Sequence, residues 1–195
     1  MKKKITLTLL ASCMAGALLA QADPIKTSHN FPIIISLQFH SFSLPFRNMK
    51  SNFSNFGIGL GTEVSINSRR DWVQQLNVAW FRNRAIGNGL LFYTQVAYRP
   101  TIDSRLYSEI KLGAGYLLAS RPVDSYALVD NQWRSVGHKG KGLLVIPVGA
   151  SLGYNAPSVS SFASYQFLLV HKYNKSIPWV PETLIQVGSS IHIDQ

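Results

Sequence analysis

The side chains best suited to acid–base chemistry in this sequence are two histidines. His40 is preceded by Ser36 and followed by Ser41-Phe42-Ser43, and His171 is followed by Lys172-Tyr173-Asn174. A histidine beside a serine can serve as the base that activates a hydroxyl nucleophile. Catalysis also requires an orienting group and an oxyanion site, which sequence spacing does not place. His40 and His171 are therefore catalytic candidates, and the ordinary expectation for each is a histidine hydrogen-bonded for structural reasons.

A second set of chemically active side chains is charged and falls on the less apolar face of alternating segments. Its members are Glu63, Arg99, Glu109 and Lys111. Each lies within several residues of a short polar turn, so we predict one interior cluster of ion pairs. Such pairs would fill the interior of a small barrel. The alternative is a gate whose pairs rearrange to open a narrow pore.

Basic side chains gather in the longer connections of the chain. They are Arg47, Lys50, Arg82, Arg84, Arg121, Arg134, Lys139, Lys141, Lys172 and Lys175. Only Asp124, Asp130 and, at the margin, Glu182 oppose them there. These residues are here called the basic rim. Arginine and lysine pair well with phosphate, so the basic rim is predicted to contact phosphorylated lipid, such as lipopolysaccharide. The alternative is an ordinary solvated and charged set of loops.

The longest connection, 120–141, contains a segment from Tyr126 to Val136 that predicts two short strands about an Asp-Asn-Gln turn. Trp133 lies beside Arg134 in this hairpin. Trp133 is a candidate anchor for a surface ligand or a partner protein. The alternative is that its ring packs onto the hairpin itself.

The elements that position these groups are short β-strands. In segment 56–67, one face carries Ile58 and Leu60 and the other carries Gly59 and Glu63. This period of two is typical of a strand and not of a helix. The predicted strands are 32–44, 53–67, 71–82, 89–100, 104–119, 142–154, 160–171 and 182–193. After residue 22, no apolar run is long enough for a spanning helix, so a membrane-spanning form would have to be a closed barrel.

The two faces of these strands differ in a way that favours a membrane barrel over a soluble one. The polar face is rich in Gly, Gln, Ser, Glu and Lys, and we expect it to be too small or too charged to form a dry core. The opposite face is apolar and carries Trp72, Trp80, Tyr98, Tyr116 and Tyr154, as expected for contact with lipid. A soluble exported barrel that binds an apolar ligand is the alternative. It would require inward-facing Ile58, Leu60, Leu112 and Ile185.

The connections differ in length on the two sides. The expected periplasmic turns are 68–70, 101–103 and 155–159, and the expected outer loops are 45–52, 83–88, 120–141 and 172–181. Short turns on one side and mostly longer loops on the other are typical of outer-membrane barrels. Within the sixth strand, Pro147 lacks a backbone donor and predicts a bulge or a local break.

The first residues predict a secretory signal peptide. Lys2-Lys3-Lys4 precede an apolar run from Ile5 to Ala20, and Ala20-Gln21-Ala22 is a small-x-small cleavage site. We therefore expect residues 1–22 to be removed and 23–195 to form a single barrel domain. Leu10-Ala11-Ser12-Cys13 offers an alternative as a lipobox. With cleavage after Ala22 the mature chain has no cysteine, which removes thiol chemistry.

The charge balance is basic. The sequence has 19 Lys and Arg against 9 Asp and Glu; without the three lysines of the signal the ratio is 16 to 9, a formal charge of +7. A nucleic-acid partner is not expected, because the signal directs the chain away from nucleic acid. No residues have metal-ligand spacing and the glycines alternate within strands, so we expect neither a metal nor a cofactor.

Taken together, the chain resembles the small eight-stranded outer-membrane barrel proteins of Gram-negative bacteria. The resemblance rests on the export signal, the strand number, the alternation and the loop asymmetry, and it covers everything after the signal. It implies an all-β, eight-stranded antiparallel up-and-down transmembrane β-barrel in the outer membrane, with outer-membrane lipid as a partner. Such barrels usually finish on an aromatic residue, whereas this chain finishes Ile191-His192-Ile193-Asp194-Gln195.

The resemblance leaves the activity open. The leading hypothesis is a non-enzymatic barrel with a filled polar lumen, which supports the envelope or binds through its surface loops. The second is a lipid A-modifying enzyme of the deacylase or acyltransferase type, acting through His40 or His171. The His-x-Ser-Asn signature of the deacylases is absent at both positions. The soluble exported barrel, in the periplasm or secreted, is the third.

Overall fold

The structure is a computed structural model of the whole chain. It describes residues 31–41, 53, 55–83, 87–120, 126–129, 132–135, 137, 140–156, 158–171 and 178–192. The predicted signal peptide and its predicted cleavage site lie outside these residues. Among the described residues, no helix is long and apolar enough to cross a bilayer.

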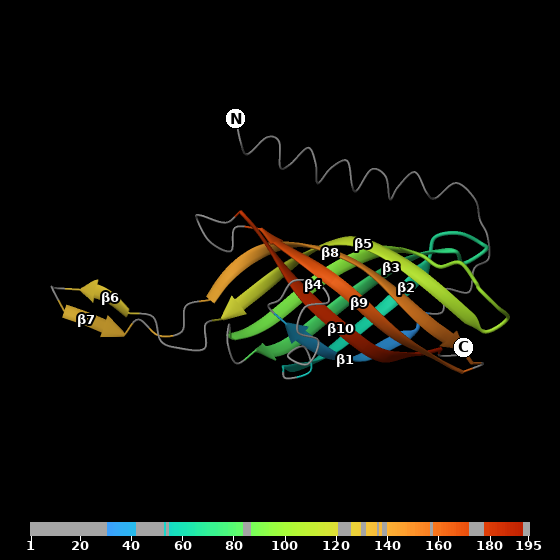
Figure 1. Cartoon of the computed structure of the whole chain (residues 1–195), viewed down its shortest axis with the longest axis horizontal. Coiled ribbons are helices and arrows are strands. Elements are labelled where there is room, and N and C mark those ends of the chain that lie inside the picture. The colour runs from blue at the N-terminus through green and yellow to red at the C-terminus, as the bar shows by residue number, and fades with distance from the viewer. Residues whose placement is uncertain are drawn as a thin grey trace, which may run out of the picture.

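Eight antiparallel strands close into a barrel (Figure 1). They are β1 (Ile33–Ser41), β2 (Phe56–Ser65), β3 (Trp72–Asn83), β4 (Gly87–Tyr98), β5 (Leu106–Ser120), β8 (Gly140–Asn155), β9 (Val159–His171) and β10 (Trp179–Ile191). Each strand pairs with its neighbour in sequence, and β1 pairs with β10 to complete the ring. The predicted strand number and the up-and-down order are confirmed.

The alternation of side chains decides which face of each strand is outside. Ile58 and Leu60 are 54 and 59 % exposed, while Gly57 and Gly59, which alternate with them, are buried. Leu112 on β5 is likewise exposed. These residues point outward, so the hypothesis of a soluble barrel with an apolar ligand inside is wrong. An apolar exterior is stable in lipid and not in water.

The break expected at Pro147 is present, but no bulge accompanies it. Pairing between β5 and β8 stops after Leu112 with Val148 and resumes at Gly115 with Val145. The register is the same on both sides of this gap, so no residue has been inserted. On its other side Pro147 pairs with Leu168 of β9 without interruption. The missing backbone donor of Pro147 therefore interrupts the hydrogen-bond ladder only on the side of β5.

The two ends of the barrel differ. At one end, here called the turn end, the strands are joined through 66–71, 99–105 and 156–158. At the other, the loop end, the connection between β5 and β8 contains β6 (Tyr126–Val129) and β7 (Gln132–Ser135). These two pair only with each other, as the predicted hairpin requires, and Figure 1 shows them beyond the barrel wall.

The interior has two halves of different character, and only one matches the prediction of a polar lumen. Toward the loop end, the inward side chains form a dry apolar cluster, here called the apolar layer. Its members are Ala79, Phe81, Leu91, Tyr93, Leu117, Leu143, Val145, Leu168, Val170 and Leu184. Toward the turn end, the inward side chains are polar or charged. The expectation that the inward face could not form a dry core is therefore wrong for the loop-end half.

Candidate functional site

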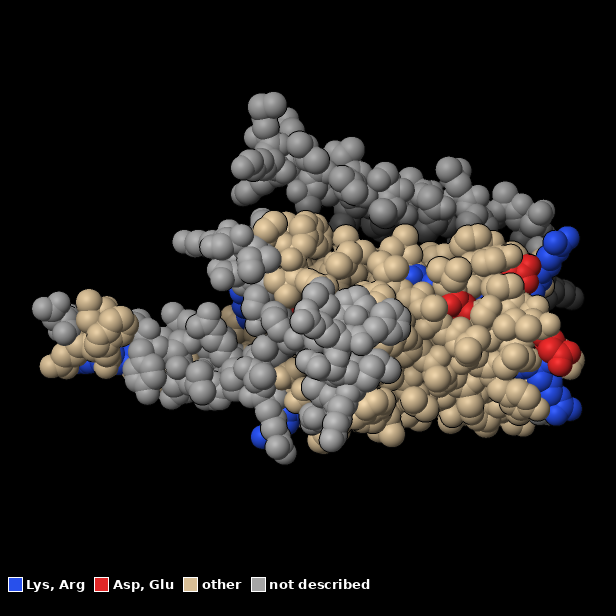
Figure 2. All heavy atoms as spheres, in the orientation of Figure 1, with Lys and Arg blue, Asp and Glu red and all other residues tan. Residues whose placement is uncertain are grey.

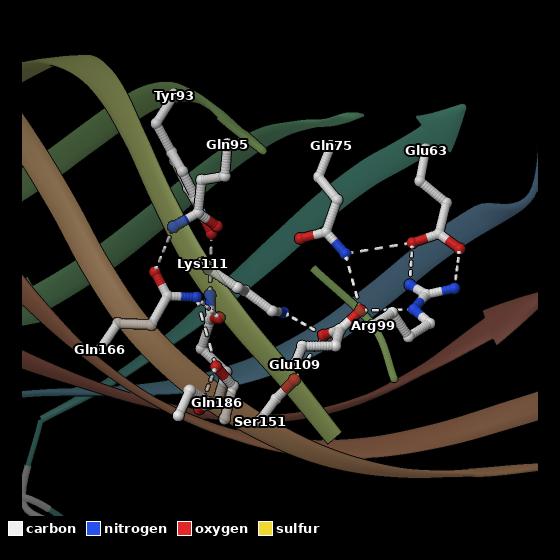
Figure 3. A network of polar contacts seen from close by, with 12 residues as sticks. Glu63, Gln75, Tyr93, Gln95, Arg99, Glu109, Lys111, Ser151, Gln166 and Gln186 are labelled. Atoms are coloured by element: carbon white, nitrogen blue, oxygen red, sulfur yellow. Dashed lines mark hydrogen bonds and ion pairs between the residues drawn. The ribbon is translucent and has the colours of Figure 1, made fainter. Parts of the chain in front are cut away.

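The structure brings all four predicted interior charges together in the turn-end half of the lumen (Figure 3). Arg99, directly after β4, is the hub of this ion cluster. Its Nη1 and Nη2 donate to the two oxygens of Glu63 at 2.8 and 2.5 Å, and its Nε donates to Glu109 Oε1 at 2.6 Å. This fork geometry is the one that guanidinium and carboxylate groups favour. One arginine thus connects β2, β4 and β5.

The remaining contacts of the ion cluster engage the second carboxylate fully. Lys111 Nζ lies 2.8 Å from Glu109 Oε2, and the Ser151 hydroxyl donates to the same oxygen. Gln75 Nε2 donates to Glu63 Oε2 at 3.1 Å. All four carboxylate oxygens are therefore occupied by donors. Two cations face two anions, so the cluster is formally neutral and is suited to holding strands together, not to moving protons.

Aromatic side chains border the two cations. The Arg99 guanidinium lies 4.9 Å from the ring centroid of Tyr107, and Lys111 Nζ lies 5.3 Å from that of Phe162. Such contacts stabilise a cation that has lost water. Glu109 and Lys111 are only 2 and 3 % exposed, so the cluster is a buried feature of the lumen.

A chain of amides continues from the ion cluster toward the apolar layer. Gln95 Nε2 donates to Gln166 Oε1, Gln166 Nε2 to Gln186 Oε1, and Gln186 Nε2 to the Tyr93 hydroxyl, at 3.1, 2.6 and 2.9 Å (Figure 3). These bonds cross the lumen between β4, β9 and β10. Alternation along the strands predicts glutamines on the inward face, but their pairing could not be predicted because the partners are distant in sequence.

A second polar cluster lies beside the apolar layer, on β1, β3 and β10, and was not predicted. His40 Nε2 lies 2.9 Å from Glu182 Oε2, and its Nδ1 lies 3.1 Å from Asn83 Nδ2. The imidazole also stacks on Phe81 with ring centroids 4.0 Å apart. His40 and Glu182 are 0 and 1 % exposed. The prediction that Glu182 lies at the margin of the basic rim is wrong. Its side chain points into the lumen, where it pairs with His40 of β1.

These contacts bear on the two catalytic candidates. Both ring nitrogens of His40 are engaged, and the ring lies inside the barrel, away from acyl chains around the wall. His171 lies on the outward face at the loop end, where its ring centroid is 4.4 Å from that of Trp179. Its Nδ1 has no hydrogen-bond partner among the described residues. The structure thus places the two histidines on opposite sides of the wall, and they do not form one site.

Three residues of the predicted basic rim are described. Arg82 is exposed on the outward face of β3, two residues beyond Trp80, and Lys141 is exposed near the start of β8. Arg134 is exposed on β7. The other members, Arg47, Lys50, Arg84, Arg121, Lys139, Lys172 and Lys175, lie outside the described residues.

The hairpin carries the most exposed tryptophan of the described chain. Trp133 is 72 % exposed, and its cross-strand partner Leu128 is 56 % exposed. Arg134 is the next residue of β7, so its side chain leaves the opposite face of the hairpin. Trp133 and Arg134 therefore do not form one combined anchor. With so much of its ring exposed, Trp133 does not pack tightly onto the hairpin.

The outer wall of the barrel is apolar between its ends. Figure 2 shows a wall with few Lys, Arg, Asp or Glu side chains between the two ends. Trp72 and Tyr98, near the turn end, have ring centroids 5.1 Å apart, and Trp80 lies toward the loop end of the same strand as Trp72. Aromatic residues at both borders of an apolar band are typical of a barrel that spans a membrane.

The fold is similar to those of several solved barrels. Neisserial surface protein A matches with a TM-score of 0.63 at 12% identity, covering 84% of this chain and 97% of its own. This is the fold of an outer-membrane barrel. The N-terminal barrel domain of Pseudomonas aeruginosa OprF matches with a TM-score of 0.57 at 12% identity, covering 85% of this chain and 100% of that domain. The likeness in fold and the apolar wall assign the chain to a bacterial outer membrane.

A third similar structure is Ail, the attachment invasion locus protein of Yersinia pestis, in complex with the heparin analogue sucrose octasulfate. It has a TM-score of 0.50 at 19% identity and covers 85% of this chain and 99% of its own. No protein-family model and no curated protein matches the sequence. The likeness of this outer-membrane barrel to others is thus one of fold.

Proposed function

We propose that this outer-membrane barrel is a non-enzymatic scaffold that presents the hairpin β6–β7 for binding at the cell surface. The observation that carries the proposal is the hairpin itself. Its Leu128 and Trp133 form an exposed cross-strand pair, and no barrel strand pairs with either of its strands in the described part of the chain. An isolated two-stranded hairpin is marginal in water, so a bound partner would stabilise it.

The chemistry of the loop end favours an anionic partner. Four basic residues stand in connection 120–141 against two acidic ones, and the mature chain as a whole is basic. An exposed indole ring can stack on a sugar, and arginine and lysine pair with sulfate or phosphate. The complex of Ail with a heparin analogue is a precedent for an anionic sugar ligand on this fold. We therefore propose an anionic glycan as the ligand.

The test is binding of the purified, folded barrel to immobilised heparin, with neutral dextran as the reference polymer. We expect retention on heparin that falls as salt rises, and a loss of about 1–3 kcal/mol in binding on Trp133→Ala, as for an aromatic anchor. Trp72→Ala is the matched control, because Trp72 is an exposed tryptophan at the opposite end of the barrel. Equal retention of Trp133→Ala and the parent protein would refute the role of the hairpin.

The basic rim is proposed to contact lipid phosphates through a different surface. Arg82 supports this, because it follows Trp80 on the outward face of β3 and so stands where the apolar wall meets the charged end. Arginine at such a border can pair with phosphate. Binding to vesicles that contain lipopolysaccharide distinguishes the basic rim from the hairpin. Arg82→Gln should weaken binding to these vesicles and leave retention on heparin unchanged.

A further inference from the structure

We propose that the apolar layer, and not the ion cluster, is the barrier that keeps this barrel from conducting ions. A gate built of ion pairs would require the rest of the lumen to be polar. The structure instead has an apolar layer across most of the lumen. The ion cluster and the amide chain lie on its turn-end side, and His40 and Glu182 lie beside the layer, where they pair in the β-ladders with its members Leu184 and Leu168.

The apolar layer extends around most of the lumen. Its members come from β3, β4, β5, β8, β9 and β10, and Leu91, Leu168 and Leu184 are completely buried. Inward side chains from six of the eight strands thus pack together, and none of them is more than 5 % exposed. A narrow eight-stranded interior is readily filled in this way.

Phe81 closes the remaining side, next to β1 and β2. A Cβ built on Gly57 of β2 would lie 2.7 Å from Phe81 Cβ, and one built on Gly89 of β4 would lie 2.3 Å from Phe81 Cζ. The ring therefore occupies the space that side chains at both glycines would need. On the β1 side it stacks on His40. The two glycines, Phe81 and the His40 ring together complete the cross-section.

The polar region on the turn-end side of the apolar layer is less tightly filled than the layer. A cavity of about 20 Å³ lies among the ion cluster and the amide chain, enough for at least one water molecule. Gln95 Oε1 and Ser190 Oγ belong to residues that line it, and neither has a hydrogen-bond partner among the described residues. Water in this cavity would satisfy them. Of the apolar layer, only Tyr93 borders the cavity, so the hydrated space ends there.

The free energy of moving an ion differs between the regions of the lumen. In the ion cluster and the amide chain, an entering ion meets charges and amides that can replace part of its hydration shell. At the apolar layer most of its neighbours are apolar, and the buried His40 and Glu182 at the edge are already bonded to each other. A bare charge in an apolar medium costs far more free energy than a hydrated one. Apolar constrictions block conduction by excluding water. Rearranging the ion pairs alone would therefore leave the lumen closed.

The experiment is ion conductance of the purified full barrel in planar lipid bilayers. We expect no channel steps from the parent protein, and none from Glu63→Gln, which breaks the pair with Arg99 at nearly constant volume. The double variant Leu91→Ser with Leu168→Ser should produce channel steps, because hydroxyl groups would let water into the layer. Leu60→Ser is the matched control, because Leu60 faces outward.

Each variant is first shown to be folded by its heat-dependent mobility on a gel. If the double variant does not fold, Phe81→Ala replaces it, since this change opens the layer beside Gly57 and Gly89 without adding a polar group. Channel steps from Glu63→Gln or from the parent protein would overturn the proposal. So would the absence of channel steps from a folded layer variant.

Discussion

At the residue scale, Arg99 is the side chain that joins the two carboxylates of the ion cluster. It pairs with two buried carboxylates from different strands and lies over the ring of Tyr107. Removing one member of a buried ion pair leaves an uncompensated charge, which costs more than the pair contributed. Arg99 is therefore the position of the ion cluster most sensitive to substitution.

Replacing Arg99 by methionine is expected to lower the free energy of unfolding by roughly 3–5 kcal/mol, because Glu63 and Glu109 would then face each other without a shared cation. The measurement is the urea midpoint of the barrel in lipid vesicles. Arg69→Met is the control, since Arg69 is exposed in a turn. An unchanged midpoint for Arg99→Met would show that the ion cluster contributes little to stability.

At the element scale, neighbouring strands are fitted together by large rings over glycines. Phe81 of β3 lies over Gly57 and Gly89, and a Cβ at Gly153 of β8 would come within 2.1 Å of Tyr107 on β5. Glycine weakens an isolated strand, but here it makes room for an aromatic ring from the adjacent strand. The inward glycines are therefore part of the packing and not gaps in it.

Gly89→Ala should destabilise the barrel by about 1–3 kcal/mol through overpacking against Phe81. Phe81→Leu in the same chain should recover part of that loss, which a double-mutant cycle of urea midpoints would measure. Gly140→Ala is the matched control, because a Cβ there would find its nearest neighbour at 3.6 Å. Additive effects of the two substitutions would contradict a contact between Gly89 and Phe81.

At the scale of the whole molecule, the placement of apolar and charged side chains is the reverse of that in a soluble protein. Apolar side chains such as Ile58 and Leu112 are exposed on the wall, while Glu109 and Lys111 are buried. Lipid around the wall makes both placements stable. The same arrangement predicts how the barrel tolerates bulky groups on its two faces.

The parent protein should appear in the outer-membrane fraction and migrate faster on a gel without boiling than with it. Ile58→Trp should keep this behaviour, because position 58 faces lipid. Gly57→Trp should lose the fast-migrating form, since even a Cβ there would come within 2.3 Å of the Trp80 carbonyl oxygen. Equal tolerance of the two neighbouring substitutions would argue against the assignment of faces.

The strands and their outward faces were predictable because each rests on local alternation. The apolar layer was not recognised, although a signal for it exists in runs such as Leu90-Leu91-Phe92 and Phe167-Leu168-Leu169-Val170. Consecutive apolar residues mean that both faces of a strand are apolar. In these runs one residue faces lipid and the next enters the layer, so alternation disappears where the lumen is dry.

Sequence by itself therefore determined the barrel, its strand order and the set of interior charges at the turn end, since these depend on the period of a strand and on short connections. Only the tertiary structure decided that His40 meets Glu182 and Asn83, and that Phe81 lies over Gly89. His40 and Glu182 are 142 positions apart and become neighbours only when β1 pairs with β10. Which inward side chains meet across a lumen depends on the register and closure of the whole ring, and no local pattern carries that information.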